Sequence, residues 1–214
     1  MDRRKQIVAD GYDQMADRYL EWTRDDPIRL RYLERLAELT PAGGRALDIG
    51  CGAGVPATRV LASRFDVIGI DLSEAQIVRA RRNVPDAEFI RADIMDIEFP
   101  AGSFDAITAF LALTHLPRTE LSTLLGRIHR WLRPGGIFLA SLGAGNNPDS
   151  VEADWLGVPM FFSHFDANEN QALVAEAGFD LLEANSVAHD EDGNMVSFFW
   201  VIARRPISPG NREM

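Results

Sequence analysis

Three glycines at alternate positions are the strongest chemical signal in this sequence. They stand in the run Ala46-Leu47-Asp48-Ile49-Gly50-Cys51-Gly52-Ala53-Gly54, where apolar residues lead into Gly50, Gly52 and Gly54. Glycine lets the backbone turn tightly against a ligand, and free N–H groups at the start of a following helix favour negative charge. A dinucleotide-binding loop would have its third glycine at position 55, which is Val55 here. The spacing favours a zwitterionic ligand, with Asp48 placed, directly or through water, for its ammonium group.

Two carboxylates follow at the ends of the next two apolar runs. Asp71 comes directly after Val67-Ile68-Gly69-Ile70, where a carboxylate can accept hydrogen bonds from both hydroxyls of a ribose. Asp93 follows the next run, and its carboxylate can receive an adenine amino group. If these runs are parallel strands, loop and carboxylates meet at the carboxyl edge of one sheet, and the predicted ligand contains adenosine.

The elements that hold these residues follow from the hydrophobic pattern. Short apolar runs alternate with helical patterns, which predicts β-α-β units and a parallel sheet. We expect strands at 45–49, 66–70, 87–91, 104–109 and 136–142, and helices that begin near Val55, Ser73 and Thr119. A helix over 168–177 precedes a predicted hairpin of strands 180–188 and 195–204, joined by a turn at 190–194.

The predicted fold class is α/β. We expect a Rossmann-like, mostly parallel, seven-stranded sheet with an antiparallel last strand and helices on both faces. Residues 1–40 have apolar side chains at helical spacings and form a predicted N-terminal helical cover. Residues 41–205 form the predicted core, in which 144–168 break the alternation as an irregular insertion free to serve a ligand, and 206–214 form a tail.

The chain resembles the class I S-adenosylmethionine-dependent methyltransferases. The resemblance rests on the glycine loop, on Asp71 and Asp93, on Phe104-Asp105-Ala106-Ile107 with His115-Leu116, and on Leu132-Arg133-Pro134-Gly135-Gly136. It covers about residues 45–142, and the closing hairpin resembles the family's antiparallel last strand. It implies methyl transfer from S-adenosyl-L-methionine to a small-molecule acceptor, which makes 144–168 the acceptor-side insertion.

Carried over by position, the resemblance assigns contacts with the cofactor. The glycines would pack against the methionine part, Asp71 would hold the ribose, and Asp93 and Ile94 would contact adenine. Ala109 and Phe110 would lie beside the sulfonium. Many family members carry a polar residue in place of Phe110, which suggests a more apolar transfer site here. Tyr12 and Tyr19 resemble an aromatic cover, although both can also be packing residues. The predicted cofactor-binding residues are Tyr12, Tyr19, Asp48, Gly50, Gly52, Gly54, Asp71, Leu72, Asp93, Ile94, Ala109 and Phe110.

Two histidines and a group of large apolar residues are candidates for the acceptor side. His115 follows the fourth predicted strand and His164 lies in the insertion, so either can take a proton from an acceptor hydroxyl, with His164 as first choice. Both also suit structural roles. The large apolar residues of the insertion can line an acceptor pocket or fill the core. They are Trp155, Met160, Phe161, Phe162 and Phe165.

Composition narrows the class of protein further. The 22 basic and 32 acidic residues give a net charge of −10, which supplies no attraction for nucleic acid. The single cysteine, Cys51, excludes an intrachain disulfide and fits a reducing compartment, and the sequence shows no metal-binding cluster. No apolar stretch has the length of a secretory or membrane-spanning segment. We expect a cytoplasmic monomer or homodimer that binds neither nucleic acid nor membrane.

Three hypotheses about function remain open at this point. A methyltransferase needs mainly to align acceptor and sulfonium for in-line displacement, so the acceptor atom can be O, N, S or a carboxylate, with or without a base. A nicotinamide-dependent oxidoreductase shares the fold and the acidic ribose residue but has a glycine at position 55. A non-catalytic S-adenosylmethionine-binding protein is the third hypothesis.

Overall fold

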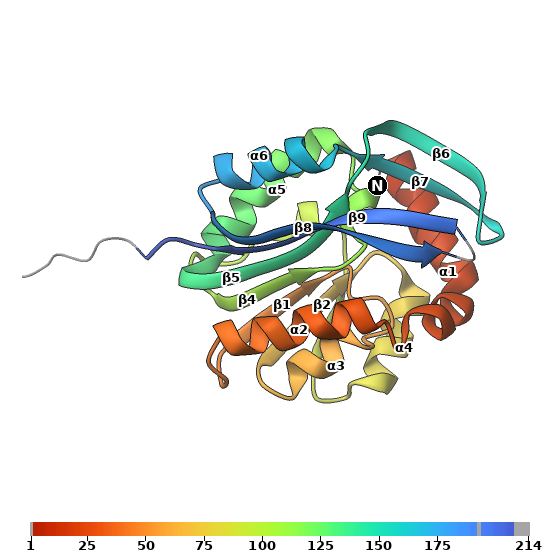
Figure 1. The fold of residues 1–214 in the computed structure, drawn as a ribbon. Helices are drawn as coiled ribbons and strands as arrows, with labels where there is room; N and C mark the ends of the chain where they lie inside the picture. Colours follow the sequence, from red (N-terminus) through yellow and green to blue (C-terminus); the bar gives the residue numbers. More distant parts are fainter. Residues whose placement is uncertain (1, 192–193, 208–214) are drawn as a thin grey trace, which may run out of the picture.

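The computed structural model describes residues 2–191 and 194–207, in which helices cover both faces of a seven-stranded sheet (Figure 1). The helices are α1 Arg3–Thr23, α2 Pro27–Leu39, α3 Ala57–Ala62, α4 Glu74–Asn83, α5 Arg118–Trp131 and α6 Ala167–Glu176, with short 3₁₀ turns η1 Ile94–Asp96 and η2 Leu113–His115. The large sheet contains β1 Arg45–Ile49, β2 Asp66–Asp71, β3 Glu88–Arg91, β4 Phe104–Ala109, β5 Leu132–Gly143, β8 Asp180–Glu191 and β9 Asn194–Arg204. A separate pair is formed by β6 Asn147–Trp155 and β7 Val158–His164.

The topology of the large sheet confirms the predicted fold class. Its strand order is β3-β2-β1-β4-β5-β9-β8. The first five strands pair in parallel, whereas β9 runs antiparallel to both β5 and β8. From β1 the chain continues to β2 and β3 on one side of the sheet, and it then returns to β4 on the other side of β1 and continues to β5. The connections that follow β1 and β4 therefore run in opposite directions, which leaves a crevice between the carboxyl ends of these two strands. Open α/β sheets bind ligands at such a switch point.

The centre of the sheet is buried on both faces. Every residue of β4 is buried, as parallel strands covered by helices on both sides require. One face packs against α5 and α6 around Trp131, and the other packs against α2 and α3 around Trp200. Both tryptophans are fully buried. This rigid layer fixes the position of the loops that leave its carboxyl edge.

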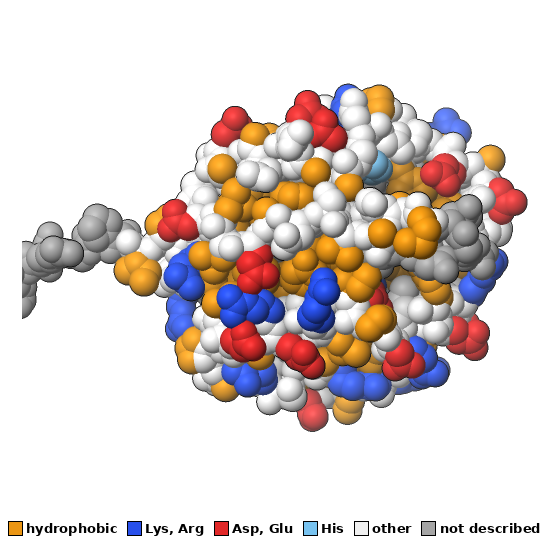
Figure 2. Space-filling model, in the orientation of Figure 1, with side chains coloured by type: hydrophobic (Ala, Val, Ile, Leu, Met, Phe, Trp, Pro, Cys, Tyr) orange, Lys and Arg blue, Asp and Glu red, His pale blue; other side chains and the backbone are white. Residues whose placement is uncertain are grey.

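The strand order that begins at β3 ends at β8, which is the last strand at that edge of the sheet. Figure 2 shows apolar side chains at the surface on both sides of this strand, and Leu182 is 37% exposed. An ion pair of 2.5 Å between Arg35 Nε of α2 and Glu183 Oε1 ties the helical layer to this edge. The residues with predicted chemistry lie elsewhere, at the carboxyl ends of β1 to β4.

The insertion predicted to be irregular is in fact a β-hairpin. Strands β6 and β7 pair antiparallel, and Leu156 and Gly157 make the two-residue turn with φ values of 51° and 87°. The prediction was wrong because β6 is polar and largely exposed, and because its register shifts twice, so no regular alternation marks it as a strand.

The other element boundaries agree closely with the prediction, with two exceptions. Strand β5 begins at Leu132, before the predicted residue 136, and the final hairpin strands reach Glu191 and start again at Asn194. Gly193, in the predicted turn, lies outside the described residues, as does the tail beyond residue 207.

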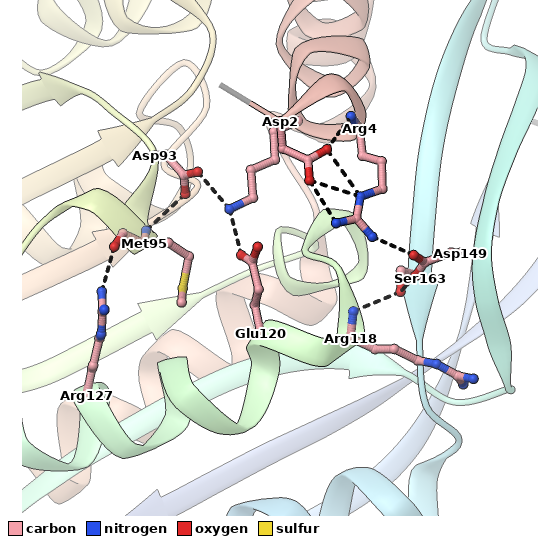
Figure 3. Close-up of polar contacts among 10 residues, drawn as sticks. Asp2, Arg4, Asp93, Met95, Arg118, Glu120, Arg127, Asp149 and Ser163 are labelled. Carbon is pink, nitrogen blue, oxygen red and sulfur yellow. Dashed lines mark hydrogen bonds and ion pairs between the residues drawn. The ribbon is translucent and has the colours of Figure 1, made fainter.

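The N-terminal helix α1 lies across the carboxyl edge of the sheet and is held there by polar contacts. Asp13 Oδ1 accepts hydrogen bonds from Ser73 Oγ at 2.5 Å and from Ala75 N at 3.0 Å, at the start of α4. Near the first turn of α1, Arg4 Nη1 binds Asp149 Oδ2 of β6 at 2.6 Å (Figure 3). Helix α2 instead packs Tyr32 into the core beneath the sheet. Only the first of the two N-terminal helices therefore covers this edge.

Candidate active site

A cavity of about 750 Å³, its open mouth included, lies between α1 and the carboxyl edge of the sheet. We call it the cofactor cavity. The residues predicted to bind the cofactor line it, with the exception of Asp48, Gly54 and Ala109. The lining residues among them are Tyr12, Tyr19, Gly50, Gly52, Asp71, Leu72, Asp93, Ile94 and Phe110.

The glycine loop forms the floor of the cofactor cavity beside β1. Gly50 has a φ of 67°, and a Cβ atom at this position would stand 2.3 Å from Ala112 Cβ. Its N–H donates a hydrogen bond of 2.8 Å to Ile70 O, which ties the loop to β2. Gly54 faces away from the cavity, because a Cβ there would contact Val84 Cγ2 at 3.1 Å. The predicted ligand contact of Gly54 is thus replaced by close packing against the end of α4.

Asp71 presents a carboxylate to the cofactor cavity in an orientation fixed by the backbone. Its Oδ2 accepts a hydrogen bond from Gly52 N, and its Oδ1 accepts one from Ser73 N, both at 2.9 Å. Each oxygen retains a lone pair that can accept from a ligand hydroxyl. Burial raises the pKa of Asp71 to about 6, although these two hydrogen bonds oppose the rise. Hydroxyl donors from a ribose would stabilise the charged form.

Asp93 lies at the other end of the cofactor cavity and is paired with a residue that the sequence prediction missed. Lys5 Nζ of α1 lies 2.7 Å from Asp93 Oδ2 and 2.6 Å from Glu120 Oε2 of α5 (Figure 3). Asp93 Oδ1 accepts a hydrogen bond of 2.9 Å from Met95 N. Lys5 is only 5% exposed, so this buried bridge helps to hold α1 over the cavity. A single lysine in an amphipathic helix gives no sequence signal for such a role.

Asp48 lies behind the glycine loop and does not line the cofactor cavity. It is 1% exposed, and its oxygens accept hydrogen bonds from Thr58 Oγ1 at 2.6 Å and Thr108 Oγ1 at 2.8 Å. Burial raises its pKa, while the two hydroxyls and the nearby Arg29 lower it. The structure therefore corrects the expectation of direct contact with a ligand ammonium: Asp48 joins β1 to β4 and α3 beneath the loop.

The end of β4 contributes apolar walls. Phe110 and Leu111 line the cofactor cavity, and Leu111, with a φ of 55°, donates its N–H to Ser141 Oγ at 2.8 Å. Ala109 precedes them, is fully buried in the core and does not line the cavity. The structure therefore contradicts its predicted contact with the cofactor. A strand reverses side-chain direction at each residue, and the sequence could not tell which of these neighbours would face the ligand.

A second, smaller cavity of about 220 Å³, its open mouth included, adjoins the first, and the two share Tyr12, Tyr19, Leu111 and His115. We call it the aromatic chamber. Its remaining walls are Trp22, Thr114, Trp155, Phe162 and Phe198. Its rings pack edge to face, with centroids 5.0 Å apart for Tyr12 and Tyr19 and 5.4 Å apart for Trp155 and Phe162.

The other apolar residues predicted to bind the acceptor belong to the protein core. Met160 and Phe161 are 0% and 1% exposed and pack with Val8 and Met15 of α1. Phe165 packs against the main core, and its ring lies 4.9 Å from the guanidinium carbon of Arg118. The structure thus corrects these three assignments, because without the hairpin register the sequence could not separate core residues from cavity walls.

His115, and not His164, is the histidine placed at both cavities. Its Nδ1 lies 2.8 Å from Phe161 O and its Nε2 lies 2.9 Å from the Tyr12 hydroxyl. Since a carbonyl only accepts, Nδ1 carries the proton and Nε2 accepts from Tyr12. Burial lowers the pKa of His115 to about 4, so the ring is neutral near pH 7. His164 Nδ1 instead contacts Gly145 O at 2.6 Å, and His164 lines neither cavity, which corrects its choice as the base.

Other kinds of site find little support in the described part of the chain. No group of three His, Cys, Asp or Glu residues is arranged there to hold a metal ion. Burial raises the pKa of the Cys51 thiol, and Cys51 packs with Ile77 and Phe89, which gives it a structural role. Within residues 2–191 and 194–207, no helix has the length and apolar character needed to cross a bilayer.

The fold and the site together define an α/β protein with a cavity at the carboxyl edge of its parallel strands, and comparisons with known proteins identify the family. Residues 46–136 match a family model described as a methyltransferase domain. The chain is 35% identical over 212 residues to 27-O-demethylrifamycin SV methyltransferase of Amycolatopsis mediterranei, covering 85% of this chain and 76% of that protein. The chain belongs to the class I S-adenosylmethionine-dependent methyltransferases, and its cofactor is S-adenosyl-L-methionine.

Further relatives agree with this membership. The 2-methyl-6-phytyl-1,4-hydroquinone methyltransferase of Synechocystis is 29% identical over 239 residues, covering 94% of this chain and 73% of that protein. The chain spans about half the length, or less, of some other curated relatives. The fold is shared with a solved structure of 1,6-didemethyltoxoflavin-N1-methyltransferase from Burkholderia thailandensis, which has 1,6-didemethyltoxoflavin and S-adenosylhomocysteine bound. The TM-score is 0.69 at 21% sequence identity, and the match covers 94% of this chain and 88% of that one. Membership of the methyltransferase family excludes the hypothesis of a nicotinamide-dependent oxidoreductase.

Proposed function

We propose that this enzyme methylates a small, flat, largely apolar molecule on an acidic hydroxyl group, such as a phenol. The observation that carries the proposal is the shared wall of Tyr12 and His115, which places a hydroxyl–imidazole pair between the cofactor cavity and the aromatic chamber. A molecule in the chamber would lie beside the cofactor's methyl group. In-line displacement at that methyl needs such a juxtaposition and the exclusion of water.

The lining of the aromatic chamber supports an apolar acceptor. Apart from Thr114, Tyr12, Tyr19 and His115, its walls carry no polar group other than the indole N–H groups of Trp22 and Trp155. Aromatic rings recognise flat ligands by stacking and edge-to-face contact. Two curated relatives are named for small molecules, 27-O-demethylrifamycin SV and 2-methyl-6-phytyl-1,4-hydroquinone, which also favours a small acceptor.

The protein's own contribution to the reaction is to bind, orient and move a proton. S-adenosyl-L-methionine supplies an electrophilic methyl group on a sulfonium. In this proposal the glycine loop, Asp71 and Asp93 hold the cofactor, and α1 with the β6–β7 hairpin closes the site to water. The acceptor hydroxyl passes its proton to the Tyr12 oxygen as Tyr12 passes its own to His115 Nε2. A histidine with a pKa of about 4 is a weak base, which favours acidic acceptor hydroxyls over aliphatic alcohols.

The test is a methylation assay with labelled cofactor and a panel of phenols and aliphatic alcohols. We expect turnover with phenols, and His115→Asn should lower kcat by about 100-fold or more while the KM for the cofactor changes little. His164→Asn is the matched control, because this histidine lines neither cavity, and it should retain activity. Equal losses in the two variants, or turnover of aliphatic alcohols alone, would contradict the proposal.

A further inference from the structure

Thr114 places a weakly bonded hydroxyl in the wall of the aromatic chamber. The residue is 4% exposed, and it lines the chamber but not the cofactor cavity. Its Oγ1 lies 3.4 Å from Leu111 O, which is long for a hydrogen bond between two oxygens, usually about 2.7–2.8 Å. Among the described residues, Thr114 Oγ1 has no other hydrogen-bond partner. A hydroxyl has one proton to donate and two lone pairs, so this group has capacity left for a ligand.

The Thr114 hydroxyl lies next to the pair proposed to take the acceptor's proton. Thr114 directly precedes His115 in η2, and consecutive Cα atoms are about 3.8 Å apart, so both side chains can contact one substituted ring. The turn is held in place, because His115 N donates to Ala112 O at 3.1 Å and His115 Nδ1 to Phe161 O at 2.8 Å. An acceptor whose hydroxyl reaches Tyr12 therefore faces a second hydrogen-bonding group in the same chamber.

The other polar groups that belong to the chamber alone are less versatile. Within the described part of the chain they are the indole N–H groups of Trp22 and Trp155, which only donate. The Thr114 hydroxyl can both donate and accept, so it suits a hydroxyl as well as an ether or carbonyl oxygen. An oxygen substituent buried against the surrounding aromatic rings without a partner would lose its hydration without compensation. Thr114 supplies that partner.

We propose that Thr114 binds a second oxygen substituent on the ring of the acceptor, which makes it a residue that determines substrate specificity. The preferred substrate is then an aromatic ring with two oxygens, of which one is methylated and the other is held by Thr114. This inference rests on the proposed function and narrows its substrate class. When the second oxygen is missing, Thr114 still has Leu111 O as a partner, so the loss is that of a single hydrogen bond between neutral groups.

A methylation assay with five compounds tests the inference. The compounds are phenol, 2-chlorophenol and the three dihydroxybenzenes. Since 2-chlorophenol is more acidic than phenol but has no second oxygen, it separates acidity from hydrogen bonding. We expect kcat/KM for at least one dihydroxybenzene to exceed the values for both monohydroxy compounds by about 3- to 10-fold, as one neutral hydrogen bond contributes. The difference should lie in KM, because the same bond is present before and during methyl transfer.

Variants of Thr114 separate recognition from a structural role. Thr114→Val removes the hydroxyl at nearly constant shape and should bring the ratio of kcat/KM for that dihydroxybenzene over phenol to about one. Thr114→Ser keeps a hydroxyl and should keep most of the preference. The matched control is Thr123→Val, at an exposed position of α5, which should leave the ratio unchanged.

Two results would overturn the inference and leave the proposed function standing. One is an unchanged ratio in Thr114→Val, because a purely structural role lowers the activity toward all five compounds equally. The other is equal kcat/KM for mono- and dihydroxy compounds in the unsubstituted protein, a comparison that holds even if Thr114→Val does not fold. Failure of the unsubstituted protein to methylate any of the five compounds would overturn the proposed function, and the inference with it.

Discussion

The two halves of the site are built in different ways. The cofactor cavity takes its polar groups from short segments that follow consecutive strands, and these groups bind nearby backbone, as Asp71 binds Gly52 N and Ser73 N. The aromatic chamber collects side chains from α1, η2, the β6–β7 hairpin and β9, which are far apart in the sequence. Local spacing and sheet topology thus specify the first half, whereas tertiary packing alone specifies the second.

The contacts that hold α1 show the same contrast. Without α1 the cofactor cavity would lose Lys5, Val8, Tyr12 and Tyr19 but keep its glycine loop, Asp71 and Asp93, whereas the chamber would lose three of its nine lining residues, Tyr12, Tyr19 and Trp22. The helix is fixed by ion pairs such as Lys5 with Asp93 and Arg4 with Asp149 (Figure 3). Acceptor binding should therefore depend on the docking of α1 more strongly than cofactor binding does.

The largest effect should come from the floor of the cofactor cavity. Gly50→Ala introduces a Cβ atom 2.3 Å from Ala112 Cβ, whereas Gly43→Ala meets nothing within 4 Å. Both positions have positive φ, so both variants should lose about 1–2 kcal/mol of unfolding free energy from backbone strain. Only Gly50→Ala should lose about 1–3 kcal/mol more from overpacking. Urea unfolding measures both, and equal losses would show that the loop is not tightly closed against the segment after β4.

A smaller effect, confined to the acceptor, should come from the aromatic chamber. Trp155→Ala removes one wall of the chamber and no wall of the cofactor cavity. We expect the KM for a phenolic acceptor to rise about tenfold, since an aromatic contact contributes roughly 0.5–1.5 kcal/mol beyond its buried area. The affinity for S-adenosylhomocysteine should change by no more than about twofold. Weaker cofactor binding in this variant would show that the two halves are coupled.

The sequence predicted the first half far better than the second, for physical reasons. Gly50, Asp71 and Asp93 were found because each follows a recognisable strand, and parallel strands place such residues at one edge. Gly54 and Ala109 were misplaced because spacing along the chain does not show which way a residue faces. His164 was preferred to His115 because the hairpin register was unknown. Lys5, which lines the cofactor cavity, was missed because a single basic residue in a helix carries no pattern.

The most direct test of the central claim is a calorimetric titration with S-adenosylhomocysteine between pH 5 and pH 8. Asp71 has a raised pKa of about 6 in the cofactor-free protein, and ribose hydroxyls favour its charged form. Binding should therefore release a proton below pH 6, so that affinity falls by up to about tenfold per pH unit as the pH drops and is constant above about pH 7. Asp71→Asn should bind more weakly and lose this dependence. Asp66→Asn, at the exposed start of the same strand, should retain it. Absence of binding, or the same pH profile in Asp71→Asn, would contradict the account.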